Sequence, residues 1–333
     1  MAEHTKIEWA DHTFNPWEGC QKVGPGCDHC YAEARDQRFT GGQHWGPGAQ
    51  RRRTSPANWR KPLAWDRAAE KAGRRARVLC ASLADVFDNA VPTEWRDDLW
   101  ALISATPHLD WLLLTKRPGN IAAMLPPSWG KGWHNVWLGC TVVNQAEADR
   151  DIPKLLAVPA AVRFLSMEPL LGPVDIDTIW LRRNGQRGTD LSNRLGDYVR
   201  PLRGNFRDSP RIGWVIVGGE SGPNARPMHP DWARSIRDQC QAAGVPFLFK
   251  QWGEWVPLET TDARRAARIT DDTPRAQWHD AVGLIADTPA TEDGLTFFSE
   301  GQVFRVGKKR AGRLLDGREW TEFPAAQSGG ANG

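Results

Sequence analysis

Three cysteines near the N-terminus have the spacing of a metal-ligand loop. Cys20, Cys27 and Cys30 follow the pattern Cys-x6-Cys-x2-Cys. Three thiolates on one loop suit a 4Fe–4S cubane in which three irons take cysteine and the fourth stays open. An open iron can bind a substrate or a cofactor, whereas ligation by four cysteines normally serves electron transfer. Gly19, Gly24 and Gly26 let the loop fold tightly around a metal.

Zinc is the alternative occupant of this loop. Sites made of three cysteines and one histidine are common for structural zinc, and His12, His29 or His44 could supply the fourth ligand. His29 lies between two of the cysteines, which is an awkward position from which to share their metal. A zinc ribbon usually carries two Cys-x2-Cys knuckles, and this chain has one. The spacing therefore favours an iron–sulfur cluster and leaves zinc open.

The composition is that of a soluble globular protein. The chain has 333 residues, 40% of them hydrophobic and 25% charged, and its net charge of +3 does not identify a partner. No apolar run approaches the roughly 20 residues of a membrane span, and the polar start has no signal-peptide core. We therefore expect a cytoplasmic protein without a membrane partner. In a reducing compartment the isolated Cys80, Cys140 and Cys240 are expected to be buried thiols rather than disulfides.

Short apolar runs alternate with amphipathic segments along the chain. Nearly continuous hydrophobicity predicts strands buried on both faces, at Val78–Leu83, Trp111–Thr115, Val136–Thr141, Val162–Met167, Trp214–Gly218 and Phe247–Lys250. Helical periodicity follows over Glu94–Ala105, Ala146–Ala157 and Asp231–Ala243. With a first strand around Thr13–Pro16, the pattern gives six or seven βα units. It predicts an α/β fold, a partial or full parallel β/α barrel over residues 5–255.

Three regions do not fit this repeat. Residues 41–77, rich in Gly, Pro and Arg, join the first unit to the second. Residues 176–211 form an arginine-rich insertion, read either as a lid over the barrel mouth or as a solvated surface excursion. Residues 256–326 are expected to form a small C-terminal extension with a basic patch at Lys308–Arg313, and residues 327–333 a disordered tail.

Polar residues follow the predicted strands, where a barrel places its chemistry. The cysteine loop also follows the first predicted strand, so we expect it at the same mouth. Lys116 or Lys250 would offer a cation to a carboxylate, and Glu168 and Glu220 are candidates for proton transfer. The full set consists of Asp85, Lys116, Arg117, Thr141, Asn144, Glu168, Glu220, Ser221, Lys250 and Gln251. Each of these side chains could instead cap a helix or close a salt bridge.

Several motifs between residues 5 and 255 together resemble the radical S-adenosylmethionine superfamily, and more closely a phage- and bacteria-associated three-cysteine-motif family. They are Ile7–Trp9, Thr13–Pro16, Cys30–Glu33, Leu114–Pro118, Ser166–Leu170, Val217–Ser221 and Phe249–Gly253. The resemblance implies a 4Fe–4S cluster on the three cysteines and reductive cleavage of S-adenosylmethionine to a 5′-deoxyadenosyl radical that abstracts hydrogen from a substrate. Within such a fold we assign catalytic roles to Glu168, Glu220 and Lys250 from their strand-end positions, and expect cofactor binding by Tyr31, Ser82, Asp85, Lys116, Thr141 and Asn144.

The chain departs from the superfamily pattern at two places. The first gap between cysteines is six residues instead of three, and the aromatic residue expected before the last cysteine is His29, with Tyr31 one place after that cysteine. The Gly-Gly-Glu motif, usual at the second strand, stands at Gly218–Glu220 after the sixth. We therefore assign the amino group of methionine to Ser82 and Asp85, and expect Glu220 to face the substrate or the ribose.

Two partner classes follow from these expectations. Radical chemistry requires a flavodoxin- or ferredoxin-like electron donor. A nucleic acid or nucleotide is the favoured substrate, because arginines near aromatic rings suit phosphates and bases; a protein or small molecule stays open. The residues concerned are Arg51–Arg53, Arg74–Arg77, the insertion, Trp45, Trp59 and Trp180. The alternative function is that of a zinc-stabilised nucleic-acid-binding protein without radical chemistry.

Overall fold

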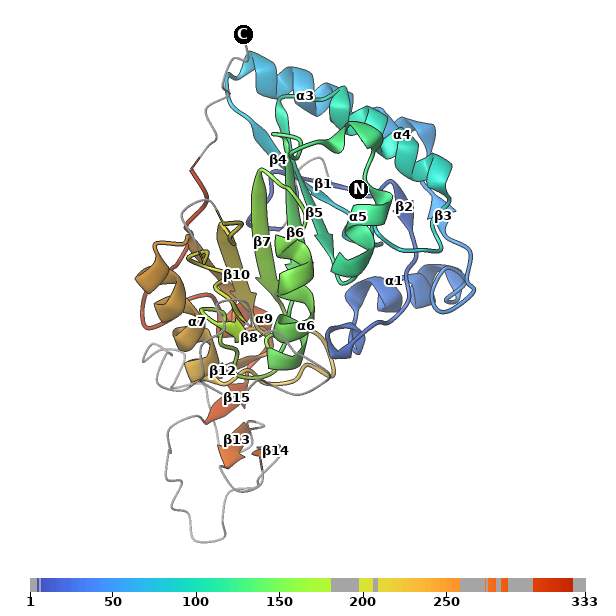
Figure 1. Cartoon of the computed structure of the whole chain (residues 1–333). Helices are drawn as coiled ribbons and strands as arrows, with labels where there is room; N and C mark the ends of the chain where they lie inside the picture. The colour runs from blue at the N-terminus through green and yellow to red at the C-terminus, as the bar shows by residue number, and fades with distance from the viewer. Residues whose placement is uncertain are drawn as a thin grey trace, which may run out of the picture.

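A seven-stranded parallel sheet forms the core of the computed structural model, which describes residues 5, 7–180, 198–205, 209–257, 273, 275–279, 283–286 and 302–325. Neighbouring strands follow the chain order and are all parallel. The sheet is curled into a half-barrel with β1 and β11 as its edges (Figure 1). Its strands are β1 (His12–Phe14), β4 (Ala76–Cys80), β5 (Leu109–Thr115), β6 (Val136–Thr141), β7 (Val162–Met167), β10 (Trp214–Gly218) and β11 (Phe247–Gln251). The predicted α/β fold is confirmed in its partial-barrel form.

Helices connect the strands and cover one face of the sheet. They are α1 (Tyr31–Thr40), α2 (Pro56–Trp59), α3 (Lys61–Lys71), α4 (Thr93–Ser104), α5 (Ile121–Met124), α6 (Gln145–Leu156), α7 (Pro230–Ala243) and the short α9 (Lys308–Ala311). The amphipathic segments thus form the predicted helices. Their apolar stripes, such as Leu99 and Ile103 of α4, join the larger hydrophobic cluster of the molecule. Burying such a stripe stabilises a helix more than its intrinsic propensity does.

The second strand of the sheet ends earlier than the sequence predicts. β4 stops at Cys80, not at Leu83, because the next residues bond to the segment after β1. The side chain of Asn15 accepts from the Leu83 N–H at 2.8 Å, and the Gly19 N–H donates to the Leu83 carbonyl at 3.0 Å. These contacts place residues 81–85 at the end of the half-barrel that carries the cysteine loop.

The face of the sheet away from the helices changes from apolar to polar along the strands. Near the amino ends it is filled by Trp137, Phe164, Trp214 and other apolar side chains, sealed by Trp9. The ring of Phe164 occupies the space that a Cβ on the facing Gly139 would need. Because side chains alternate along a strand, the next positions on this face are polar: Thr141, Ser166 and Lys250. The carboxyl ends of the strands therefore form a polar mouth above an aromatic floor.

Smaller sheets extend this core. A two-stranded sheet joins β2 (Trp17–Glu18) to β3 (Arg52–Arg53), and another, within the predicted insertion, joins β8 (Ile179–Trp180) to β9 (Tyr198–Val199). The C-terminal part forms a sheet in the order β12 (Trp255–Pro257), β15 (Val303–Arg305), β13 (Arg275–His279) and β14 (Gly283–Ala286).

The chain then returns to the half-barrel, where Thr321 pairs with Leu248 of the β11 edge. The domain boundary at residue 255 stays a prediction. The interior of the insertion, residues 181–197, and the predicted tail lie outside the described residues. Among the described residues, no helix combines the length and the hydrophobicity needed to cross a bilayer.

Candidate functional site

The cysteine loop connects β2 to α1 beside the polar mouth. Cys20 pairs with Trp45 in a parallel bridge, which fixes its backbone. Cys27 is buried in a short 3₁₀ turn, Pro25–Cys27, and Cys30 is the N-cap residue of α1. The three predicted ligands therefore lie on three differently held segments of one loop. Cys80, Cys140 and Cys240 are buried free thiols, as predicted.

Two glycines let the loop lie directly against the start of α6. A Cβ on Gly26 would stand 2.8 Å from Cγ1 of Val143, and a Cβ on Gly24 would overlap the Glu147 carboxylate. Larger residues at these positions would push the loop away from the sheet. The glycines thus bring the cysteines close to the strand ends. The sequence alone predicted only that they let the loop fold around a metal.

The three thiols of the loop are candidate ligands for a cluster or for a zinc ion. Among the residues that the structure describes, no group of three or more His, Cys, Asp or Glu side chains is arranged to hold one metal ion. A tetrahedral zinc site requires all its ligands to meet at one point. In a cubane each cysteine binds a different iron, so its ligands stand farther apart. The loop supplies three thiols, the number that leaves one iron open, and no other described cysteine is near the surface.

Arg117 connects Cys20 to the sheet. Its guanidinium donates to Sγ of Cys20 at 3.5 Å, to the Gln21 carbonyl at 3.0 Å and to Asp85 at 2.9 Å. Burial raises the pKa of the Cys20 thiol to about 11, with Asp85 adding to the effect and Arg117 opposing it. Without a metal this thiol is therefore protonated at neutral pH. A bound metal ion would have to displace the proton.

A partly buried ion pair occupies the mouth itself. Nζ of Lys250 donates to Oε2 of Glu168 at 2.8 Å, and this pair joins two of the predicted catalytic residues from β11 and from the end of β7. Oε1 of Glu168 is buried and lacks a hydrogen-bond partner among the described residues. Gly218 makes room for this carboxylate, because a Cβ there would stand 2.7 Å from Oε1. The glycine therefore accommodates the chain's own carboxylate.

Lys116 and Thr141 face the same mouth. Gly26 of the cysteine loop lies next to Lys116, since a Cβ there would stand 3.5 Å from Cε of the lysine. Lys116 forms no ion pair within the described part of the chain. It is thus a cation between the cysteine loop and the strand ends. Thr141 is buried opposite Ser166 in the β6–β7 register.

Glu220, the third predicted catalytic residue, is bound by the chain's own groups. It accepts from the Arg226 backbone N–H at 2.7 Å, from the Arg226 guanidinium at 2.7 and 2.9 Å, and from Nδ1 of His29 at 3.1 Å. Burial raises the pKa of this carboxyl, but the Arg226 hydrogen bonds outweigh it and leave the pKa lowered. Arg226 also donates to Asp28 and to the Pro25 carbonyl. Glu220 therefore anchors the cysteine loop.

The residues assigned to the amino group also have structural partners. Asp85 accepts from Phe87, Thr115, Lys116 and Arg117, so both of its oxygens are occupied. The Ser82 hydroxyl bonds to Asn15, and its carbonyl accepts from the Tyr31 hydroxyl at 2.5 Å.

Asn144 is a helix cap. Its side chain accepts from the Glu147 N–H at the start of α6 at 2.9 Å. Its binding of a cofactor, like that of Asp85, stays a prediction. Asp85 instead has the partners of a residue that positions Arg117.

Sequence reasoning missed the two arginines that hold the loop. Arg226 was not singled out, and Arg117 appeared only as a neighbour of Lys116. Their partners lie far away in the chain, since Arg226 reaches Pro25 across 201 positions. The available signal was the Arg-Pro pair at Arg117–Pro118, which directly follows a strand.

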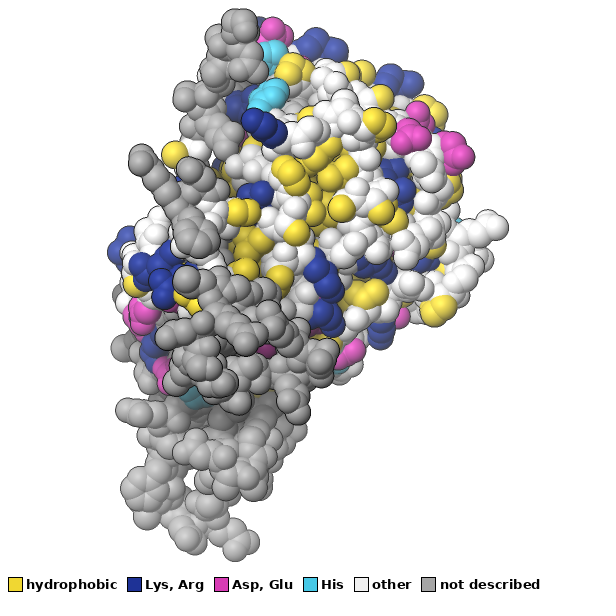
Figure 2. All heavy atoms as spheres, viewed as in Figure 1, with side chains coloured by type: hydrophobic (Ala, Val, Ile, Leu, Met, Phe, Trp, Pro, Cys, Tyr) yellow, Lys and Arg dark blue, Asp and Glu magenta, His cyan; other side chains and the backbone are white. Residues whose placement is uncertain are grey.

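The arginine runs behind the nucleic-acid prediction are used within the fold. Arg51 pairs with buried Asp88, Arg52 with Glu18 and Arg53 with Asp98. Arg74 and Arg77 both pair with Asp11, and Arg75 pairs with Asp110. On the face drawn in Figure 2, the Lys and Arg side chains are separated by apolar and uncharged ones. Each of these arginines thus has a carboxylate partner within the fold, and a nucleic acid as substrate stays a prediction.

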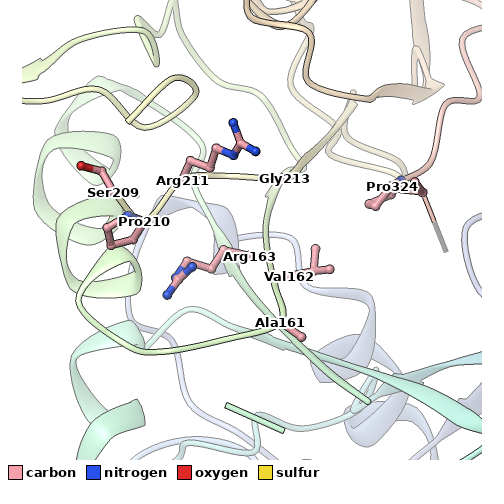
Figure 3. Close-up of a pocket in the computed structure, with 9 residues that line it drawn as sticks. Ala161, Val162, Arg163, Ser209, Pro210, Arg211, Gly213 and Pro324 are labelled. Atoms are coloured by element: carbon pink, nitrogen blue, oxygen red, sulfur yellow. The ribbon is translucent and has the colours of Figure 1, made fainter. Parts of the chain in front are cut away.

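A separate hollow of about 450 Å³ lies at the other end of the sheet (Figure 3). It is bounded by Ala161, Val162 and Arg163 at the start of β7 and by Arg211 and Pro324. The Arg163 guanidinium donates to the Val158 carbonyl at 2.6 and 2.9 Å. It is therefore occupied within the fold, and the hollow is remote from the cysteine loop.

A family model described as "Protein of unknown function (DUF5131)" matches residues 4–324. The chain belongs to this family. The match includes both the cysteine loop and the C-terminal sheet, so the family's shared unit extends beyond the half-barrel. It gives no support for the phage family that the motifs resemble. None of the curated proteins compared with the chain matches it.

Solved structures similar to this chain include two of spore photoproduct lyase. One is complexed with the dinucleoside spore photoproduct, with a TM-score of 0.39, 11% identity, 87% of this chain covered and 71% of that chain. The other is a double mutant with bound AdoMet and the same dinucleoside, with a TM-score of 0.38, 11% identity, 85% of this chain covered and 69% of that chain. At such scores we take nothing about activity from the likeness.

Proposed function

We propose that the chain binds a 4Fe–4S cluster through Cys20, Cys27 and Cys30 and uses it with S-adenosylmethionine as a radical enzyme. The observation that carries this proposal is the position of the cysteine loop. Gly24 and Gly26 pack the loop against the β6–α6 junction, beside the polar ends of the strands. A structural metal staple would have no reason to lie there, whereas β/α folds place their chemistry at this end.

The cofactor would supply the difficult step. When bound, the reduced cluster supplies one electron to the sulfonium of S-adenosylmethionine, which yields methionine and a 5′-deoxyadenosyl radical. Because that electron comes from outside the chain, we propose a flavodoxin- or ferredoxin-like donor.

The chain's own residues would bind and orient the second cofactor. Lys116 lies next to the cysteine loop without an ion-pair partner among the described residues, so it is our choice for the carboxylate of methionine. The Glu168 carboxylate is 15% exposed and is held in place by Lys250. This carboxylate would accept from the amino group of methionine or from a ribose hydroxyl, which is an alternative to the role proposed for Ser82 and Asp85.

Purification without oxygen, followed by reconstitution, tests this function. We expect a brown protein with about four irons per chain that forms 5′-deoxyadenosine when dithionite and S-adenosylmethionine are added. Cys20→Ala should lose the colour and the product, while Cys80→Ala should retain both, since the Cys80 thiol is buried in β4 and is not part of the loop. A colourless wild-type protein holding one zinc ion would refute the proposal and favour the binding-protein alternative.

A further inference from the structure

Arg117 contacts the sulfur of Cys20 directly. The Arg117 guanidinium donates to Sγ at 3.5 Å, and the arginine side chain is only 8% exposed. The same guanidinium donates to the Gln21 carbonyl at 3.0 Å, so it holds the backbone beside the sulfur as well. Hydrogen bonds from a charged donor are roughly twice as strong as neutral ones.

The position of Arg117 is set by the carboxylate of Asp85, whose two oxygens both accept hydrogen bonds. Asp85 accepts from Arg117 at 2.9 Å, from Oγ1 of Thr115 at 2.7 Å and from the Phe87 N–H at 2.9 Å. These donors come from the ends of β4 and β5, so the sheet fixes the orientation of Asp85. The guanidinium is therefore presented to Cys20 by the rigid part of the molecule.

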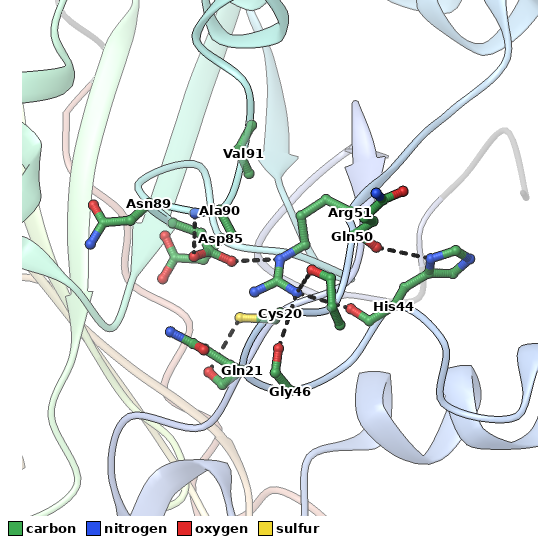
Figure 4. Close-up of polar contacts among 12 residues, drawn as sticks. Cys20, Gln21, His44, Gly46, Gln50, Arg51, Asp85, Asn89, Ala90 and Val91 are labelled. Atoms are coloured by element: carbon green, nitrogen blue, oxygen red, sulfur yellow. Dashed lines mark hydrogen bonds and ion pairs between the residues drawn. The ribbon is translucent and has the colours of Figure 1, made fainter.

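A second buried guanidinium adjoins the backbone of Cys20. Arg51 has no exposed side-chain surface and pairs with Asp88 at 2.8 Å. Its Nη1 donates to the Gly46 carbonyl, and the Gly46 N–H donates to the Cys20 carbonyl at 2.8 Å. Figure 4 shows this group of contacts around Cys20. Nη2 of Arg51 is buried without a partner among the described residues, and a buried donor of this kind favours a nearby negative charge.

We propose that Arg117 sets the reduction potential of the cluster that Cys20 binds, as a positioning residue that does not touch substrate. Reduction adds one negative charge, and a fixed guanidinium in a poorly solvated place stabilises that charge. Hydrogen bonds to the sulfurs and local charge are the levers by which proteins tune iron–sulfur potentials. This inference rests on the proposed function, because it needs the cluster.

The charges around Cys20 give the direction in which the reduction potential changes. Arg117 and Asp85 cancel each other as net charges, yet only Arg117 donates to the sulfur. Replacing Arg117 with glutamine removes the donor's charge and leaves Asp85 negative beside the cluster. Both changes disfavour the reduced state, so the potential becomes more negative.

The experiment is a redox titration of the reconstituted protein, followed by the electron paramagnetic resonance of the reduced cluster. Arg117→Gln should disfavour reduction at least tenfold, a shift of about 59 mV for one electron. The matched control is Arg75→Gln. Arg75 pairs with Asp110 at 2.7 Å, at the opposite end of β5, so this variant removes an equivalent charge remote from the cluster. Its potential should equal that of the wild type.

Arg117→Lys keeps the fold testable if a lone Asp85 prevents folding of the glutamine variant. Lysine retains the charge opposite Asp85, but its single nitrogen cannot replace both Nη1, which bonds to Asp85 and the sulfur, and Nη2, which bonds to Gln21. Its potential should fall between those of the wild type and Arg117→Gln.

Three outcomes decide the matter. Unchanged potentials in folded, cluster-loaded Arg117 variants would overturn this inference and leave the proposed function intact. An equal shift in Arg75→Gln would also overturn it, because the effect would then be general. A wild-type chain that forms no iron–sulfur signal would overturn the proposed function and this inference together.

Discussion

Replacing Arg226 with alanine should loosen the cysteine loop while leaving the half-barrel folded. The Arg226 guanidinium makes two hydrogen bonds to Glu220, at 2.7 and 2.9 Å, and one each to Asp28 and the Pro25 carbonyl. Glu220 is 6% exposed, so the variant leaves a buried carboxylate without its main counterion. It keeps the backbone N–H of residue 226 and Nδ1 of His29.

The cost can be worked out from these contacts. Breaking a buried ion pair by removing one partner costs about 3–5 kcal/mol. Arg226 is 28% exposed, and water can replace part of its role, so we expect about 2–3 kcal/mol. Unfolding entropy of about 2.1 cal/mol/K per residue amounts to ~0.7 kcal/mol/K for 333 residues. The melting temperature should therefore fall by about 3–4 °C.

The pH dependence of this loss identifies its cause. The folded-state pKa of Glu220 is lowered by Arg226, so the pair's contribution is complete above the unfolded pKa of about 4.3 and disappears as the pH falls through the folded value. The difference in stability between wild type and Arg226→Ala should stay constant near neutral pH and shrink in acid. Thermal unfolding over a pH series measures it.

A local readout and a control complete the test. Trypsin should cleave after Lys22, an exposed residue of the loop, faster in Arg226→Ala than in the wild type. Arg234→Ala is the control, because its partners Asp231 and Asp316 are more exposed than Glu220 and such pairs are worth under about 1 kcal/mol. Equal destabilisation of the two variants, or a loss that persists unchanged in acid, would refute the reasoning.

Three further predictions concern two of the cysteines, Lys116 and two of the glycines. Cys27→Ala should abolish the visible absorbance of the reconstituted protein, whereas Cys240→Ala, in the buried face of α7, should retain it and cost on the order of 1 kcal/mol in a thermal melt. Lys116→Met should raise the KM for S-adenosylmethionine about tenfold or more, since a charge-assisted hydrogen bond is worth about 1.5–3 kcal/mol, with an unchanged melting temperature; a 5′-deoxyadenosine assay measures it. Gly219→Ala should destabilise by about 3 kcal/mol, because its Cβ would overlap the Trp252 carbonyl, whereas Gly119→Ala, with a 3.5 Å contact, should be neutral in denaturant unfolding.

The strands were predictable because burial on both faces leaves a signal within each strand. β6 and β7 have the predicted bounds, Val136–Thr141 and Val162–Met167, and they consist almost entirely of buried residues. The end of β4 was not predictable, since Leu83 is diverted by Asn15, a partner 68 positions away. Apolar character predicts that a segment is buried but does not specify which acceptors its backbone N–H groups will bond to.

The location of the candidate site could be predicted from the sequence. The roles of its individual residues were less predictable. Alternation along β11 brings Lys250 to the mouth, where it pairs with Glu168, which follows β7 on the other side of β10. Glu220 looked equivalent by the same rule, yet Arg226 and His29 bind it within the fold. A strand-end position does not distinguish a free carboxylate from a bound one, because the deciding partners lie on loops without periodic structure.

The two arginines that bind the loop, Arg117 and Arg226, make the same kinds of contact from opposite parts of the sheet. Arg117 pairs with Asp85 after β4 and donates to the Gln21 carbonyl, and Arg226 pairs with Glu220 after β10 and donates to the Pro25 carbonyl. Each arginine is held by a buried carboxylate and donates a hydrogen bond to a carbonyl of the loop. Sites that assemble only around their metal leave the free protein unfolded. Here side chains that follow the strands bind the loop at both ends of the gap between Cys20 and Cys27, so the fold itself holds this part of the cysteine loop.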